Sequence, residues 1–213
     1  MSPRFDTIEG LPVATRFLGG PACLDFANTT ERMRSEKPND WLTGYSVLLA
    51  WSRARGTLTS AAVSSLSATA RREHSATAAV FEKAVAIRTD IRKLAEACAD
   101  GEPIAEAVRH ANNWLTDLPP QPAIALPRNG AHGHFQLRGA RLDEPLWPIL
   151  WSLTNLMTSE DIARVHRCEG HGCGYYFVDT TLNRSRRFCS STGCGNRSRA
   201  RRFHRLHRLE DRS

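Results

Sequence analysis

Apolar residues in the first three quarters of the chain recur at the spacing that is typical of amphipathic helices. Their pattern predicts one helix of about three turns over residues 41–56, which ends near Gly56. A longer helix is predicted from about Thr69 to Ala99, because apolar residues follow one another there at steps of three and four positions. The members of this stripe are Val80, Ala84, Ile87, Ile91, Leu94 and Cys98. Cys98 is therefore expected to be a small buried hydrophobic side chain.

Two further helices are predicted after residue 100. The first covers residues 104–115 and is ended by a run of prolines that begins at Pro119. The second covers residues 147–157 and has Pro148 in its first turn, where proline is tolerated. Because this last segment is apolar on most sides, it is expected to be buried in the core.

A short β-hairpin is predicted between these two helices. Its strands are residues 124–126 and 135–137, and an Asn-Gly pair at residues 129–130 supplies a strong turn signal. Together with the helices, the hairpin gives a mostly α N-terminal domain over residues 1–160. A polar segment then marks the boundary to a second domain, residues 161–213.

Composition and charge distinguish the two domains. The 213 residues are 41% hydrophobic and 24% charged, which is ordinary for a globular protein and excludes a disordered tail protein. Of the formal charge of +7, residues 162–213 contribute +8 and the rest of the chain −1. A polyanionic partner is therefore expected to bind the C-terminal domain. The apolar runs are too short for a membrane helix and the first 30 residues lack a secretory pattern, so a soluble cytoplasmic protein without membrane contact is expected.

Four of the six cysteines form the pattern Cys168-x4-Cys173 and Cys189-x4-Cys194. Two such pairs can direct four sulfur atoms at one tetrahedral zinc ion, whereas a disulfide framework is typical of short secreted chains. Four thiolates leave no open coordination position, so the Zn²⁺ is expected to be structural. Two alternatives to a four-cysteine zinc site remain. The metal could be iron in the same cage, or His171 could replace one cysteine as a ligand. The segment from Cys168 onward has few large apolar side chains and is expected to unfold without its metal.

An arginine-rich helix is predicted after the last of these cysteines. Its arginines recur at helical spacing beside an apolar stripe of Ala200, Phe203 and Leu206. We expect this surface to contact the phosphates of a nucleic acid. The candidate contacts are Arg186, Arg187, Asn196, Arg197, Arg199, Arg201, Arg202, Arg205 and Arg208.

Several of these basic residues have alternative explanations. A zinc ion with four thiolates carries a formal charge of about −2, which Arg167, Arg187 and Arg197 could simply offset. Asn196 suits a bidentate contact with adenine, and it suits equally well the cap of the helix that it begins. A solvated arginine-rich face without a partner is the remaining alternative.

The N-terminal domain offers weaker candidates for chemistry. Asp25 and Asn28 lie among apolar residues and could contact a small ligand, although helix capping or a core hydrogen bond is the simpler explanation. His132 and His134 could bind a metal, and the five tryptophans could line a pocket, but loop and core positions explain them more simply. The sequence contains no phosphate-binding loop and no hydrolase motif, so the chain is not expected to be an enzyme.

Two motifs of the chain resemble those of a bacterial protein family. The string Cys-Gly-Asn-Arg at residues 194–197 and Phe-Val-Asp-Thr at residues 177–180, with the cysteine spacing, resemble the CGNR zinc finger. Phe-Leu-Gly-Gly at residues 17–20 and Leu-Asp-Phe-Ala-Asn-Thr at residues 24–29 resemble the opening motif of the ABATE domain, which is usually found in front of that finger. The resemblance covers nearly the whole chain and implies a stress-responsive transcriptional regulator.

From the residues and this resemblance together, we expect a DNA-binding regulator. Its C-terminal part is expected to be a treble-clef-like zinc finger with four cysteine ligands that ends in a basic helix, and its N-terminal domain to sense a small ligand. A homodimer is an arrangement that the sequence leaves open. An RNA-binding module and a zinc-stabilised protein-interaction module are the rival functions, because both would use the same charge.

Overall fold

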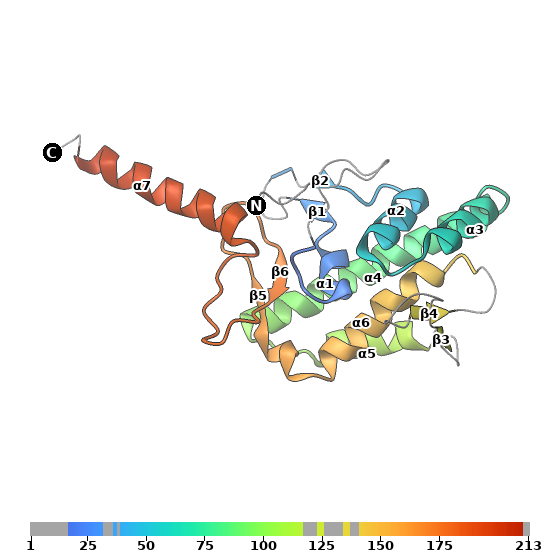
Figure 1. The fold of residues 1–213 in the computed structure, drawn as a ribbon. Helices are drawn as coiled ribbons and strands as arrows, with labels where there is room; N and C mark the ends of the chain where they lie inside the picture. The colour runs from blue at the N-terminus through green and yellow to red at the C-terminus, as the bar shows by residue number, and fades with distance from the viewer. Residues whose placement is uncertain are drawn as a thin grey trace.

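The fold was obtained as a computed structural model, which describes residues 17–31, 36–37, 39–116, 123–125, 134–136 and 141–210. Over these ranges the chain is mostly helical, with three two-stranded antiparallel sheets (Figure 1). The helices are α1 (Ala22–Ala27), α2 (Tyr45–Arg55), α3 (Ser60–Ala70), α4 (His74–Asp100), α5 (Ala105–Leu115), α6 (Trp147–Met157) and α7 (Asn196–Glu210). The strands pair as β1 (Thr30–Glu31) with β2 (Asn39–Asp40), β3 (Ala123–Ala125) with β4 (His134–Gln136), and β5 (Val165–Arg167) with β6 (Tyr176–Val178). The short helical turns are η1 (Glu144–Leu146), η2 (Glu160–Arg164) and η3 (Ser191–Gly195).

The helices predicted near residues 41–56, 104–115 and 147–157 are confirmed as α2, α5 and α6. The long helix predicted over residues 69–99 is wrong at its start, because a separate helix, α3, ends at Ala70 and α4 begins at His74. The sequence of α3 is rich in alanine, serine and threonine, and Leu66 is its buried residue, so its apolar stripe is too weak to recognise. Six residues of α1 are likewise too few to show a helical period.

The apolar stripe predicted along α4 faces the core. Its central members Ala84, Ile87, Ile91 and Leu94 are buried. Cys98, at the end of the stripe, is only half-buried, although burial still raises the pKa of its thiol. The helix therefore packs most closely through its middle turns.

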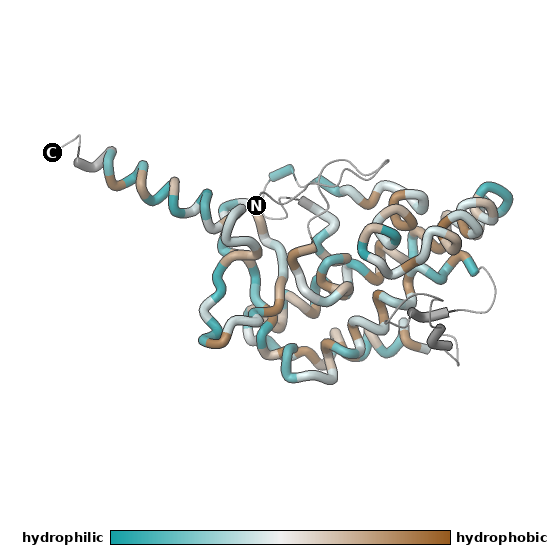
Figure 2. The backbone as a smooth tube through the Cα atoms, viewed as in Figure 1, coloured by the Kyte–Doolittle hydropathy of each residue, from teal (hydrophilic) through white to brown (hydrophobic). Residues whose placement is uncertain are grey.

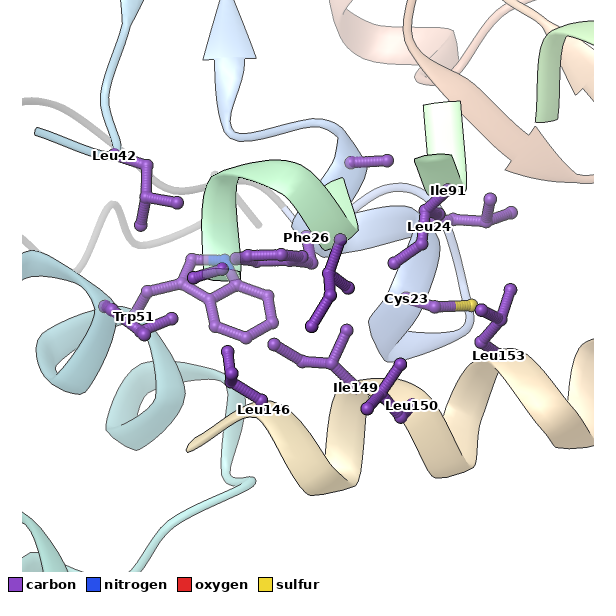
Figure 3. Close-up of a cluster of buried hydrophobic side chains, with 14 of the residues drawn as sticks. Cys23, Leu24, Phe26, Leu42, Trp51, Ile91, Leu146, Ile149, Leu150 and Leu153 are labelled. Carbon is purple, nitrogen blue, oxygen red and sulfur yellow. The ribbon is translucent and has the colours of Figure 1, made fainter. Parts of the chain in front are cut away.

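Helix α1 lies at the centre of the helical core, against both α4 and α6 (Figure 1). Its apolar side chains Cys23, Leu24 and Phe26 are fully buried, and the ring centroid of Phe26 lies 5.2 Å from that of Trp51 in α2. The other labelled side chains of this cluster are Leu42, Ile91, Leu146, Ile149, Leu150 and Leu153 (Figure 3). The predicted burial of α6 is therefore confirmed.

The predicted β-hairpin is confirmed in its strands. β3 pairs with β4 in antiparallel register, with Ile124 opposite Phe135. Residues 126–133, which would contain the turn and His132, lie outside the described residues, as does the side chain of His134.

The hairpin β5–β6 packs onto the helical domain and does not stand apart from it. Val165, Tyr176 and Val178 belong to the same buried apolar cluster as α1, α4 and α6. Arg167 of β5 adds an ion pair with Glu96 of α4 at 2.9 Å. The hairpin therefore joins the C-terminal module to the core of the N-terminal domain. A second buried cluster lies within the module itself and consists of Cys168, Tyr175, Phe177, Cys189 and Cys194.

Helix α7 extends away from the rest of the molecule (Figure 1). Hydrophilic and hydrophobic turns alternate along it (Figure 2), and its apolar side chains Phe203 and Leu206 are 59% and 49% exposed. No helix among the described residues is both long enough and apolar enough to cross a membrane.

Candidate metal centre and nucleic-acid interface

The first cysteine pair is positioned by the β5–β6 hairpin. The backbone N–H of Cys168, directly after β5, donates to the carbonyl of Tyr175 at 2.8 Å. Gly172 and Gly174 in the turn have φ angles of 73° and 75°, a region that favours glycine. Cys173 lies between these two glycines, so the turn brings its sulfur back toward that of Cys168.

The second cysteine pair lies at the entry to α7. Ser190 Oγ accepts a hydrogen bond from the N–H of Gly193 at 3.0 Å, and its carbonyl accepts one from Gly195 at 2.9 Å. These bonds close the turn η3, which follows Cys189 and contains Cys194. A hairpin with one pair, followed by a second pair at the start of a helix, is the treble-clef-like arrangement that the sequence predicts.

The four cysteine sulfurs converge on one point. All of the Sγ atoms lie within 4.8 Å of one another, and two of the Sγ–Sγ distances, Cys173–Cys189 and Cys189–Cys194, are 3.8 Å. A tetrahedral zinc ion with Zn–S bonds of about 2.3 Å separates its sulfurs by roughly 3.8 Å, whereas a disulfide needs about 2.05 Å. The cage therefore fits one zinc ion with no open coordination position.

Gly170 lies against this cage. A Cβ atom at this position would be 2.8 Å from the Sγ of Cys194 and 3.3 Å from the Sγ of Cys168. Real Cβ atoms do not approach sulfur this closely without displacing it. Glycine at residue 170 is therefore a steric requirement of the metal site, which the sequence showed only as one of several nearby glycines.

Hydrogen-bond donors surround the sulfur of Cys168. The backbone N–H groups of Gly170 and Cys189 donate to it at 3.4 and 3.3 Å. Both backbone bonds stabilise the charged form of this sulfur. The thiolate, which is the form that binds zinc, is therefore favoured.

The arginines near the cage differ in their partners. Arg197 contacts a ligand sulfur, because its Nη2 lies 3.1 Å from the Sγ of Cys194. Arg187 instead forms an ion pair with Glu169, and Arg167 pairs with the acidic side chains at the end of α4. Of the three arginines expected to offset the thiolate charge, Arg197 is thus the one placed to do so directly.

Arg186, one of the predicted nucleic-acid contacts, is bonded within the zinc module. Its guanidinium lies 4.3 Å from the centroid of the Phe177 ring. It donates to the carbonyls of Phe188 at 3.1 Å, Val178 at 3.3 Å and Leu18 at 3.4 Å. The N–H groups that would bind phosphate are therefore used inside the protein. Charge and position in the sequence could not reveal these partners.

Asp179, from the Phe-Val-Asp-Thr string, organises the loop that follows β6. Its carboxylate accepts hydrogen bonds from the backbone N–H and the hydroxyl of Thr181, and from the backbone N–H of Arg186 at 2.8 Å. Although burial opposes it, these hydrogen bonds lower the pKa of Asp179. The buried carboxylate thus fixes the loop between the two cysteine pairs.

Helix α7 carries the remaining candidates for nucleic-acid contact. Arg199 donates to the carbonyl of Ser191 at 3.2 Å and to the side-chain oxygen of Asn196, so both candidates are paired within the module. Among the arginines of α7 whose side chains are described, Arg201, Arg202 and Arg205 are exposed and have no hydrogen bond or ion pair with any described residue. The side chain of Arg208 lies outside the described residues.

Two family models match the chain, one for each part of it. The ABATE model, whose description reads "Putative stress-induced transcription regulator", matches residues 20–160. The CGNR zinc finger model matches residues 164–207. The chain belongs to the ABATE family. No curated protein matches its sequence. The CGNR match and the geometry of the cage agree, so the four cysteines hold one structural zinc ion.

The opening motif of the ABATE domain contacts strand β6 of the zinc finger, and this contact is called the joint below. The carbonyl of Gly19 accepts a hydrogen bond from the N–H of Val178 at 3.1 Å, and the side chain of Asn28 pairs with the backbone of Tyr176. A Cβ atom on Gly19 would lie 2.8 Å from the Cβ of Leu24, so glycine is required there too. The motif is visible in the sequence, but its contact with a strand 148 residues later is not.

Asp25 stabilises the same joint from inside the ABATE domain. Its carboxylate accepts hydrogen bonds from the N–H of Gly19 and from the Nε of Arg55, both at 2.7 Å. Burial outweighs these interactions and raises the pKa of Asp25 to about 6. Asp25 and Asn28 are therefore core hydrogen-bonding residues, as the simpler explanation of the sequence has it, rather than ligand contacts.

A buried arginine, Arg88, ties α4 to the segments around β1 and β2, and no pattern in the sequence indicates this role. Its guanidinium donates to the hydroxyl of Thr29 at 3.0 Å and to the carboxylate of Asp40 at 2.7 Å. Although burial opposes it, the bonds from Arg88 lower the pKa of Asp40. Arg92, one turn further on, donates to the carbonyl of Ala27 at 2.8 Å, and burial lowers its pKa to about 10.

The five tryptophans of the ABATE domain occupy core and half-buried positions. Trp41, Trp51 and Trp147 are buried, as core residues are expected to be. Trp114 is half-buried and donates through its Nε1 to Asp90 at 2.8 Å. Trp151 is half-buried on α6.

Proposed function

We propose that this ABATE-family protein regulates transcription by binding DNA through its zinc finger and α7. The observation that carries the proposal is the placement of α7, whose first residues adjoin the cysteine cage while the rest extends away from the body (Figure 1). Arg201, Arg202 and Arg205 lie on the extended part and are exposed. Their guanidinium groups are therefore accessible to phosphate oxygens.

The dimensions and charge of α7 suit a groove of DNA. An α-helix is about 10–12 Å across, and the major groove of B-DNA is about 12 Å wide. Arg201 and Arg205 are four residues apart, so they share one face and can reach the same phosphate backbone. Phe203 and Leu206 lie on another face, where they can make apolar contacts with thymine methyl groups.

A salt titration of DNA binding tests the proposal. Arginine–phosphate contacts release counterions, so the affinity of the zinc-loaded protein for a mixed-sequence duplex is expected to fall steeply as salt rises. Replacing Arg201 and Arg205 together by alanine is expected to weaken binding to every duplex alike and to reduce the slope of log Kd against log salt by about 2. Fluorescence anisotropy at several salt concentrations measures both quantities.

The matched control replaces Arg71 and Arg72 by alanine, because these exposed arginines between α3 and α4 carry the same charge far from the finger. This double variant is expected to bind DNA with an unchanged slope. Absence of binding at low salt, or an equal effect of the two double variants, would overturn the proposal. An RNA duplex that competes better than DNA would assign the surface to RNA instead.

We further propose that the protein works in the cytoplasm as a regulator without catalytic activity of its own. Four of the six cysteines hold zinc and the other two, Cys23 and Cys98, form no disulfide, which suits a reducing compartment. Residues 1–160 would then act as the part that responds to a small ligand, and α7 as the part that engages DNA.

A further inference from the structure

A cavity lies between α1, α6 and the segment that leads into the zinc finger. Its volume is about 530 Å³, which is in the range of cavities that hold small molecules. Pro21 lines it at the start of α1, and Thr57 lines it after the end of α2. Helix α6 contributes Trp151, Ser152 and Asn155.

The lining combines an aromatic ring with polar side chains and one charge. Trp151 offers a flat apolar surface, and Ser152 is held in place because its hydroxyl oxygen accepts a hydrogen bond from the N–H of Cys23 at 3.1 Å. Asp161 brings a negative charge, whereas no lysine or arginine of the described chain lines the cavity. A cation would therefore be attracted to this cavity and an anion repelled.

The cavity also touches two of the segments that connect the ABATE domain with the zinc finger. Pro21 lies two residues after Gly19, whose carbonyl is bonded to Val178 of β6. Asp161 belongs to η2, which leads directly into β5. A molecule bound in the cavity would contact both of these connecting segments.

We propose that this cavity binds a small organic cation that carries a flat apolar group, such as an arylalkylamine or an aromatic amidine. The flat group would pack against Trp151, and the cationic group would pair with the carboxylate of Asp161. The inference rests on the proposed function only in taking the ABATE domain to be the ligand-responsive part, because binding in the cavity does not require DNA.

Benzamidine and benzoate provide a matched pair of probes, since they share a ring and differ in charge. Each is titrated into the zinc-loaded full-length protein labelled with nitrogen-15 at its tryptophans, and the indole N–H signals are followed by NMR. The Trp151→Phe variant assigns the signal of Trp151. Benzamidine is expected to shift this signal in a saturable manner, and benzoate at the same concentrations is expected to leave it in place.

Two variants at neighbouring acidic residues test the role of the charge. Asp161→Asn is expected to weaken benzamidine binding by about two- to fivefold, the effect of one exposed ion pair. Glu160→Gln, which removes a neighbouring charge that does not line the cavity, is expected to change nothing. Absence of a saturable shift would exclude a binding site in the cavity. Equal binding of benzamidine and benzoate would exclude a preference for cations, and so would equal effects of the two variants. Failure of DNA binding would leave these readouts intact, so the two proposals can fail separately.

Discussion

The side-chain amide of Asn28 pairs with the backbone of Tyr176 as a neighbouring β-strand would. Its Nδ2 donates to the carbonyl of Tyr176 at 2.8 Å, and its Oδ1 accepts from the N–H of the same residue at 2.9 Å. Both groups are buried, so no water can replace the amide. The edge of β6 therefore depends on one side chain from the ABATE domain.

Asn28→Ala is expected to lower the free energy of unfolding by about 2–4 kcal/mol, because it leaves a buried N–H and a buried carbonyl without partners. Chemical denaturation of the zinc-loaded protein measures this loss. Asn112→Ala, at an exposed position of α5, is the matched control and is expected to stay within about 0.5 kcal/mol of the parent. A similar small effect at residue 28 would mean that the two parts of the chain are held together without this joint.

The metal site could be predicted from the sequence because its chemistry is carried by residue type and spacing. Cysteines at residues 168, 173, 189 and 194 have few other uses in a chain of this kind, and a single ion brings them together. The amide of Asn28 has many uses, and its partner is a backbone group whose position only the complete fold sets. For the same reason, charge alone did not distinguish Arg186, which is bonded inside the module, from Arg201 on the exposed part of α7.

The helical core likewise has some features that the sequence predicts and others that it does not. The long apolar stripe of α4 and the dense apolar sequence of α6 predict buried helices, because burial is a property of the periodic pattern itself. The break between α3 and α4 depends on local turn geometry around Arg71 in a segment of small and polar residues, where the pattern carries little information.

Gly170→Ala is expected to impair zinc binding, because the added methyl group would overlap the sulfurs of Cys168 and Cys194. We expect its zinc to exchange to a chromophoric chelator at least about tenfold faster than in the parent, a weakening typical of a disturbed ligand shell. Gly195→Ala is the matched control within the Cys-Gly-Asn-Arg string. A Cβ atom there would meet its nearest neighbour, the carbonyl oxygen of Ser190, at 3.4 Å, which is an ordinary contact. Equal zinc retention in the two variants would contradict the steric argument.

Removal of zinc is expected to expose the loop between the two cysteine pairs. Arg186 is held there by bonds to Phe188 and to the Phe177 ring, which lie beside the cage. Without the metal, the four sulfurs lose their common ligand and the loop should open, so trypsin is expected to cleave after Arg186 about tenfold faster or more. Mass spectrometry of timed digests measures this rate. Added zinc should restore protection and added magnesium should not, and an unchanged rate in the metal-free protein would show that the shared core alone holds the loop.

The buried carboxyl group of Asp25 is expected to make stability depend on pH. Its pKa is raised by burial to about 6 in the folded protein, compared with about 3.9 in an unfolded chain. Between these values the folded state binds more protons than the unfolded state, so the contribution of Asp25 is fully present below about pH 4 and is lost as the pH rises through 6. The loss amounts to at most about 3 kcal/mol.

Asp25→Asn tests this contribution, because the amide cannot ionise and keeps an oxygen that can accept the hydrogen bond from Gly19. Denaturation curves of the parent and the variant are compared at intervals from about pH 4 to pH 7. Release of zinc in acid affects both proteins alike, so the difference between their unfolding free energies isolates residue 25. The unfolding free energy of the variant should increase relative to that of the parent as the pH rises. A constant difference would mean that the bonds from Gly19 and Arg55 offset the burial of the carboxylate and that Asp25 stays ionised across the range.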